Sequence, residues 1–86
     1  MDEHQYELTA HAAAVMAERG IERAWVERVL RAPEHVHVDR MDPSLTHALG
    51  RIAERGQRML RVVYNASASP LRVVTAYFDR RQGGDA

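Results

Sequence analysis

The sequence contains neither cysteine nor lysine. Without cysteine, the chain cannot form disulfides and has no thiol to act as a nucleophile or metal ligand. It has no run of about 18 apolar residues, so we expect no membrane-spanning helix. Its first residues, MDEHQYE, are acidic and polar, unlike a secretory signal. Together these absences predict a cytoplasmic protein that does not engage a membrane.

Several motifs are also missing, among them a glycine-rich phosphate loop, a nucleophile elbow and a zinc-type Cys/His pattern. No cofactor is therefore predicted. His35, His37 and Asp39 do alternate along one expected strand and would share one face of it. Two histidines and a carboxylate suit iron or zinc. The alternative is a solvated strand face without a metal, which we favour because no fourth ligand stands out.

The charges are unevenly distributed along the 86 residues. Residues 1–50 hold five Arg against nine Asp and Glu, a balance of −4, whereas residues 51–86 hold seven Arg against three acids, a balance of +4. A basic second half favours a surface that faces anions. Arginine grips phosphate in a planar, bidentate manner, although an all-arginine composition is also typical of a general compositional bias.

Two helices are predicted in the first half of the chain. Thr9 is a suitable N-cap for a helix that runs to Arg19, and Gly20 is suited to end it. A second helix over residues 22–31 places Trp25 on its apolar face, where we expect it to pack in the core. Both helices are amphipathic, so they can cover one face of a sheet.

Four strands are predicted in the rest of the chain, over residues 35–40, 46–53, 59–64 and 71–78. In the first of them Val36 and Val38 are expected to point inward. The segment 46–53 also has a helical pattern, but Gly50 weakens it and we favour a strand. Residues 1–6 are expected to form a short extended lead-in.

The predicted fold is α+β, with an N-terminal helical hairpin packed on one face of a four-stranded antiparallel sheet. A chain of this length makes one domain, which we place at residues 1–81. The tail, residues 82–86, is rich in glycine and is expected to be disordered. The helices would leave the other face of the sheet open for binding.

Four residues are candidates for a site on that open face. Arg61 lies mid-strand between Leu60 and Val62, so it should point away from the core. Arg80 directly follows the last strand. Tyr77 can stack on a base or donate a proton, or simply pack. His11, at the border of the first helix's apolar stripe, is a candidate acid or base, or a residue that caps the core edge.

The chain resembles a bacterial family of domains of unknown function. The resemblance is carried by residues 6–21 (YELTAHAAAVMAERGI), 25–30 (WVERVL), 56–64 (GQRMLRVVY) and 73–81 (VVTAYFDRR). It is also similar, more loosely, to the BrnT and RelE/ParE-type toxins. One departure is Val15, where the family usually has Arg.

The resemblance to these toxins implies a RelE/BrnT-like domain that acts as a metal-independent endoribonuclease in a toxin–antitoxin system. RNA, including ribosome-associated RNA, and an antitoxin protein would then be its partners. Arg61 and Arg80 would contact the scissile phosphate, with His11 and Tyr77 as further catalytic candidates. Two alternatives remain open at this stage: a non-catalytic module that binds RNA or a protein through the same face, and a metal-binding protein that uses His35, His37 and Asp39.

Overall fold

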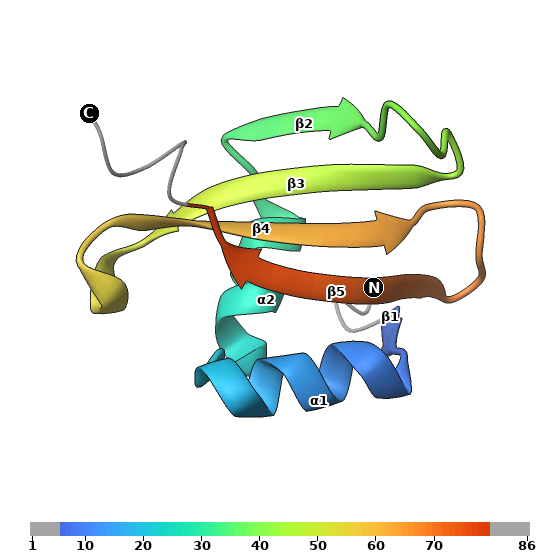
Figure 1. The fold of residues 1–86 in the computed structure, drawn as a ribbon. Coiled ribbons are helices and arrows are strands. Elements are labelled where there is room, and N and C mark those ends of the chain that lie inside the picture. The colour runs from blue at the N-terminus through green and yellow to red at the C-terminus, as the bar shows by residue number, and fades with distance from the viewer. Residues whose placement is uncertain (1–5, 80–86) are drawn as a thin grey trace.

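The computed structural model describes residues 6–79 as a two-layer α+β domain (Figure 1). The Arg80 position and the predicted tail at 82–86 lie outside these residues, as does most of the predicted lead-in. Among the residues described, neither helix is long and apolar enough to cross a membrane. In chain order the elements are β1 (Tyr6–Leu8), α1 (Ala10–Arg19), α2 (Arg23–Arg31), β2 (His35–Val38), β3 (Leu45–Ile52), the 3₁₀ turn η1 (Ala53–Arg55), β4 (Arg58–Asn65) and β5 (Leu71–Phe78).

The sheet has five strands in the order β1-β5-β4-β3-β2. The four strands from β2 to β5 form the predicted antiparallel meander, but β1 pairs in parallel with β5, with Tyr6 opposite Leu71. The prediction of a four-stranded antiparallel sheet behind an N-terminal helical hairpin is therefore wrong. The cause is β1, which precedes the helices and adds a fifth strand at the edge of β5.

The chain crosses the sheet between its two edges. β1 lies at one edge, the two helices pass beneath the sheet, and β2 forms the opposite edge (Figure 1). α1 packs against β5, and α2 packs against β3 and β4. Both helices therefore cover the same face and leave the other face without a helical cover, as expected.

The ends of α1 follow local sequence signals. The hydroxyl of Thr9 accepts a hydrogen bond from the backbone N–H of Ala12 at 3.0 Å, as an N-cap should. Gly20 ends the helix with a left-handed φ of 66°, a conformation that costs glycine little. The predicted caps of this helix are confirmed.

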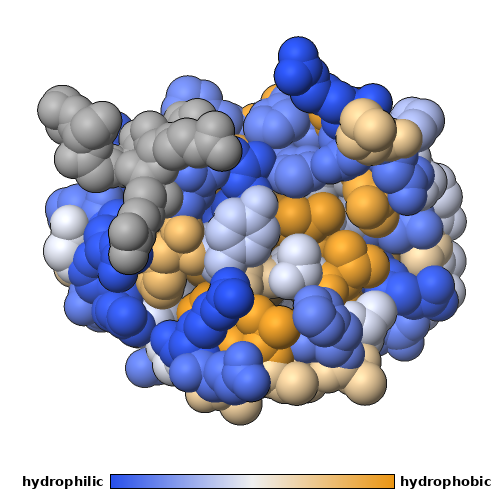
Figure 2. Space-filling view, in the orientation of Figure 1, coloured by the Kyte–Doolittle hydropathy of each residue, from blue (hydrophilic) through white to orange (hydrophobic). Residues whose placement is uncertain are grey.

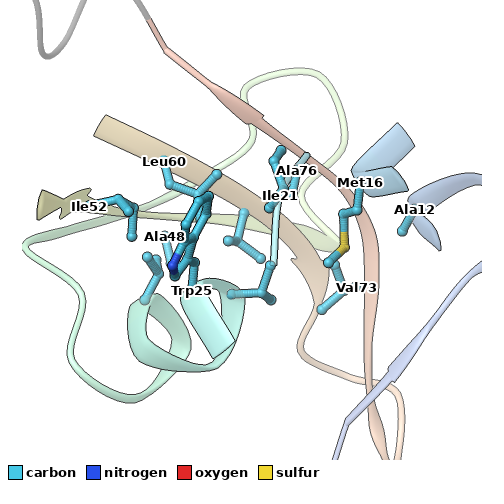
Figure 3. Packing of buried hydrophobic residues seen from close by; sticks show 12 residues of the cluster. Ala12, Met16, Ile21, Trp25, Ala48, Ile52, Leu60, Val73 and Ala76 are labelled. Carbon is cyan, nitrogen blue, oxygen red and sulfur yellow. The ribbon is translucent and has the colours of Figure 1, made fainter. Parts of the chain in front are cut away.

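The core lies between the helices and the sheet (Figure 3). Trp25, on α2, is only 6% exposed and meets Phe78 of β5 edge to face, with ring centroids 6.2 Å apart. The core position predicted for Trp25 is confirmed. The cluster comprises Ala12, Met16, Ile21, Trp25, Val26, Val29, Ala48, Ile52, Leu60, Val62, Val73 and Ala76. In the orientation of Figure 1, apolar surface shows between β5 and α1, ringed by hydrophilic side chains (Figure 2).

β3 forms where the sequence left a helix as the alternative. Gly50 is buried in this strand, directly below α2. A Cβ at Gly50 would lie 3.2 Å from a methyl group of Val29, so the missing side chain allows the helix to approach the strand closely. The residue that weakens a helical interpretation of the segment thus has a packing role in the strand.

β2 departs from its predicted burial. Val36 and Val38 are 53% and 55% exposed, so the prediction that they point into the core is wrong. Their side chains alternate with His35 and His37 and lie on the helix side of the sheet, as the pairing of Val36 with Ala48 requires. The reason for their exposure is that α2 covers β3 and β4 and does not extend over this edge strand.

Candidate functional site

Arg61 is the centre of a polar cluster on the face of the sheet opposite the helices. Its neighbours in β4, Leu60 and Val62, are fully buried in the core, so the guanidinium projects to the other side. Only 12% of the Arg61 side chain is exposed. A nearly buried guanidinium must be paired, because an unpaired charge with little access to water is costly.

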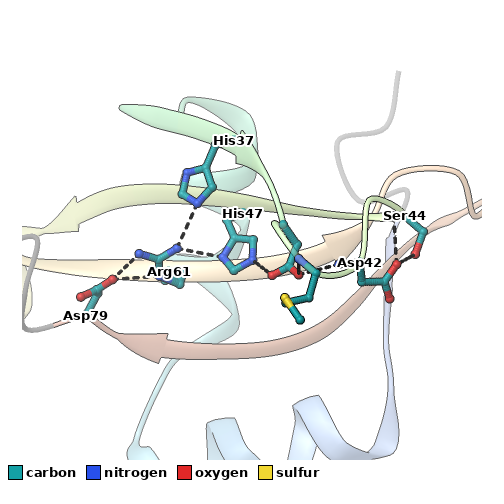
Figure 4. Close-up of polar contacts among 8 residues, drawn as sticks. His37, Asp42, Ser44, His47, Arg61 and Asp79 are labelled. Carbon is teal, nitrogen blue, oxygen red and sulfur yellow. Dashed lines mark hydrogen bonds and ion pairs between the residues drawn. The ribbon is translucent and has the colours of Figure 1, made fainter.

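The guanidinium of Arg61 is held by three side chains from three other parts of the sheet (Figure 4). Its Nε donates to Oδ2 of Asp79 at 2.9 Å, and its Nη2 donates to the same oxygen. Its Nη1 donates to Nδ1 of His47 at 2.8 Å. The same Nη1 lies 3.4 Å from Nε2 of His37. β2, β3, β4 and the end of β5 thus each contribute one member.

These contacts fix the proton positions on His47. Arg61 can only donate, so Nδ1 of His47 must accept and carries no proton. The other ring nitrogen, Nε2, lies 2.7 Å from Oδ1 of Asp39, to which it donates. His47 is therefore neutral, with its proton on Nε2. A directed chain of hydrogen bonds runs from Arg61 through the imidazole to the carboxylate of Asp39.

Asp39 is itself anchored by the turn after β2. Its Oδ2 accepts from the backbone N–H groups of Met41 and Asp42, at 3.0 and 2.9 Å. The hydrogen bond from His47, followed by the one from the Asp42 backbone, lowers the pKa of the Asp39 carboxyl. Asp39 is thus held as an anion at neutral pH, which stabilises the tautomer of His47.

His37 is the exposed member of the cluster. Its ring stacks on that of His47, with centroids 4.9 Å apart and the planes within 15°. Partial burial is the main cause that lowers the pKa of His37, followed by the electrostatic effects of His47 and Arg61. At neutral pH His37 is consequently an uncharged imidazole at the surface, beside a fixed cation, and can accept a proton.

The cluster combines acid–base groups with one cation and two carboxylates. With both histidines neutral, Arg61 contributes +1 and Asp39 and Asp79 contribute −1 each. No group of three or more His, Asp or Glu side chains within residues 6–79 is arranged to hold a metal ion. Asp39 bonds His47, so the set His35, His37 and Asp39 is not assembled as the ligand triplet considered from the sequence.

The residues predicted for the site are placed as follows. Tyr77 lies directly opposite Arg61 on the neighbouring strand and on the same face. His11 is exposed on α1, in the helical layer on the far side of the sheet, so it does not join Arg61. Arg80 lies outside the described residues. The structure therefore brings Arg61 and Tyr77 together and separates His11 from both.

Three members of the cluster were not among the predicted catalytic residues: His37, His47 and Asp79. The available signal was register. His37 and His47 lie five residues on either side of Asp42, where the sequence predicts a turn, so a symmetric hairpin would pair them. Asp79, at the end of the last strand, gave no comparable signal.

A scan against family models finds one match, over residues 8–78, to a domain of unknown function, DUF4258. The chain belongs to this family. The match covers both helices and the strands from β2 to β5, including the strand positions of His37, His47 and Arg61. It confirms the predicted resemblance to a family of domains of unknown function.

Comparison with curated proteins and with solved structures finds no match to the chain. The looser resemblance to the BrnT and RelE/ParE-type toxins therefore has no support from these comparisons. For this DUF4258 domain, functional inference has to start from the cluster itself.

Proposed function

We propose that the face centred on Arg61 binds RNA and cleaves it without a metal, as a toxin-like endoribonuclease. The observation that supports this is the placement of a neutral histidine, His37, within 3.4 Å of the fixed guanidinium of Arg61. Metal-independent cleavage of RNA needs a base for the 2′-hydroxyl, a proton donor for the leaving oxygen and a cation for the charge that develops on the phosphate. The first and third of these are adjacent here.

The proposed roles follow from exposure and bonding. His37, exposed and uncharged at neutral pH, takes the proton of the 2′-hydroxyl, in place of His11. Arg61 stabilises the phosphate charge, and Tyr77 beside it stacks on a base or gives a proton to the leaving oxygen. His47 is a positioning residue that holds Arg61 through its bond to Asp39. Arg80 remains a proposed second phosphate ligand.

A test is cleavage of end-labelled RNA by the full chain in EDTA. We expect products with 2′,3′-cyclic phosphate ends. Arg61→Ala should lower the rate by about 10²–10³, as for loss of one preorganised stabiliser of charge. Arg28→Ala is the matched control, because Arg28 lies on the helical layer and bonds Glu54. Loss of activity in His11→Gln but not in His37→Gln would contradict the assignment of the base.

A non-catalytic module that binds RNA or a protein is the second candidate. It is favoured by the charge of the cluster, since Asp39 and Asp79 outweigh the single cation and Arg61 is already bonded on several sides. In this case Arg61→Ala weakens binding and no turnover exists. RNA left intact with and without ribosomes, together with unimpaired growth on induction, would refute the ribonuclease proposal.

A further inference from the structure

β2 leaves one edge of the sheet unpaired within the described residues. The backbone N–H of Asp39 donates to the carbonyl of Leu45 on β3 at 2.9 Å. In an antiparallel pair the residues that bond to a given neighbour alternate, so His37 and His35 also direct their backbone groups to β3. The backbone groups of Val36 and Val38 therefore point outward from the sheet.

The side chains of the same two valines are unusually exposed. Val36 and Val38 are 53% and 55% exposed on the helix side of the strand, beyond the reach of α2. An edge that combines free backbone groups with exposed β-branched side chains is a template for a further strand. Native sheets commonly guard such edges with lysine, proline or a bulge, and β2 has none of these.

The sequence around β2 is complementary to itself in one antiparallel register. Residues 34–40 read EHVHVDR, with His37 at the centre. When a second copy pairs about that centre, Val36 faces Val38, His35 faces Asp39, and Glu34 faces Arg40. Each of these pairs occurs twice, and every polar pair joins an acid with a base or a histidine.

Shifted registers lose this match. Outward-pointing residues must pair with each other, so the centre can move only to a neighbouring residue. A centre at Val36 would place Glu34 opposite Val38, and a centre at Val38 would place Val36 opposite Arg40. Both bury a charge against a valine, so the register centred on His37 is preferred.

We propose that β2 pairs with β2 of a second copy of this chain, antiparallel and centred on His37, to join two sheets into one. The partner's chemistry is specified by this self-complementarity, and the proposal does not depend on the ribonuclease activity. The pairing would set His37 of each copy beside His37 of the other, next to the His47 stack. Two Arg61 clusters would then lie on one continuous face.

Sedimentation of the full chain over a range of concentrations tests the proposal. We expect a concentration-dependent mass of two chains. Val36→Lys should leave only the monomer, and circular dichroism should show a retained fold because Val36 is not part of the core. A monomer at every concentration would overturn the proposal, including the case in which a strand of a different protein occupies this edge.

Charge reversal tests the register. Glu34→Arg alone should weaken the dimer, because two arginines would face each other twice, and Arg40→Glu alone should weaken it by acid–acid repulsion. The double variant should restore it. Glu18→Arg on α1 changes the net charge by the same amount as Glu34→Arg and should have no effect. Failure of the double variant to recover would refute this register.

The absence of cysteine allows a covalent test. His37→Cys places one thiol at the proposed centre, a non-hydrogen-bonded pair with Cα atoms about 4.5 Å apart. This lies within the usual range for a disulfide, about 4.4–6.8 Å. We expect rapid formation of a disulfide-linked dimer. Ala14→Cys, exposed on α1, is the control, and equal cross-linking there would contradict the proposal.

Discussion

The two faces of β3 and β4 are lined by alternate residues of the same strands. Towards the helices these strands present Ala48, Ile52, Leu60 and Val62, all within the core cluster. The opposite face carries His47 and Arg61 beside a smaller apolar floor made of Leu49, Met59 and Val63, which are also buried. One face therefore depends on apolar burial and the other on polar groups that must all find partners.

This difference determines how each face responds to substitution. Apolar burial is non-directional, and neighbours can partly relax around a lost side chain. A polar cluster with little exposure is directional, so removal of one member leaves the others unsatisfied. Every member of the Arg61 cluster comes from a different strand or strand end, which makes it a sensitive reporter of strand register.

The largest effect is expected on the helix-covered face. Trp25→Ala should lower the free energy of unfolding by about 3–5 kcal/mol, because it removes a large side chain from a packed core. Small domains have total stabilities of about 5–15 kcal/mol, so this variant should be nearly unfolded at physiological temperature. Urea denaturation measures the loss, with Arg31→Ala on exposed α2 surface as control. An unchanged midpoint would mean that the core is assigned to the wrong face.

Loss of the central guanidinium should have the next largest effect. Arg61→Met should cost about 1.5–3 kcal/mol, the range for hydrogen bonds to charged groups, since Asp79 is left with an 11% exposed carboxylate. A double-mutant cycle with Asp79→Asn should give a coupling of about 0.5–3 kcal/mol. Additive effects would show that the two side chains do not act as a pair.

A moderate dependence on pH is expected from His37. Its pKa is lowered in the folded protein, so the unfolded chain takes up a proton first as the pH falls. The contribution of neutral His37 to stability is therefore present above the ordinary histidine pKa of about 6.5 and is lost as the pH falls through it. Urea midpoints at neutral and mildly acidic pH should differ less for His37→Gln than for wild type. An NMR titration of His37 at or above its ordinary value would contradict this.

The smallest effect is expected for an exposed ion pair on the helical layer. Arg28 and Glu54 are bonded twice, at 3.0 and 3.1 Å, but their side chains are 46% and 51% exposed. Solvent screens such pairs, so Arg28→Ala should leave the melting temperature unchanged within error. Compared with Arg61→Met, it isolates the effect of burial on an Arg–carboxylate pair.

The same pair makes a prediction about titration. The bond from Arg28 lowers the pKa of Glu54 from 4.5 to about 2. Its contribution is therefore present above the ordinary pKa and is lost as the pH falls towards 2. NMR should show this pKa rising in high salt, because salt screens exposed charges. A value that ignores salt and Arg28→Ala would exclude the pairing.

The elements that local signals specify were predicted well from the sequence. Thr9 and Gly20 mark the ends of α1, and the alternation around Arg61 places its side chain on the face away from the core. β1 was missed because three residues carry too little periodicity, and its pairing with β5 is a contact between distant parts of the chain. The burial of Val36 failed for a related reason, since alternation gives the side of the sheet and not whether a helix covers it.

The centre of the candidate site was predicted, but its partners were not. Arg61 stands out as a charge within an apolar strand. Its contacts with His47 and Asp79 depend on how three strands align, and alternation in each strand alone does not give that alignment. His11 was favoured because it borders an apolar stripe. That stripe faces the helix-covered side, which places it away from the cluster.

The parallel pairing of β1 with β5 also bears on the order of folding. Tyr6, near the start of the chain, pairs with Leu71, near the end of the described sequence. During synthesis β1 therefore has no partner until β5 has left the ribosome, whereas the hairpins from β2 to β5 can form between neighbours. Closing this long loop is an entropic cost met late. Chains that end before β5 would leave β1 without a partner strand and much of the core exposed.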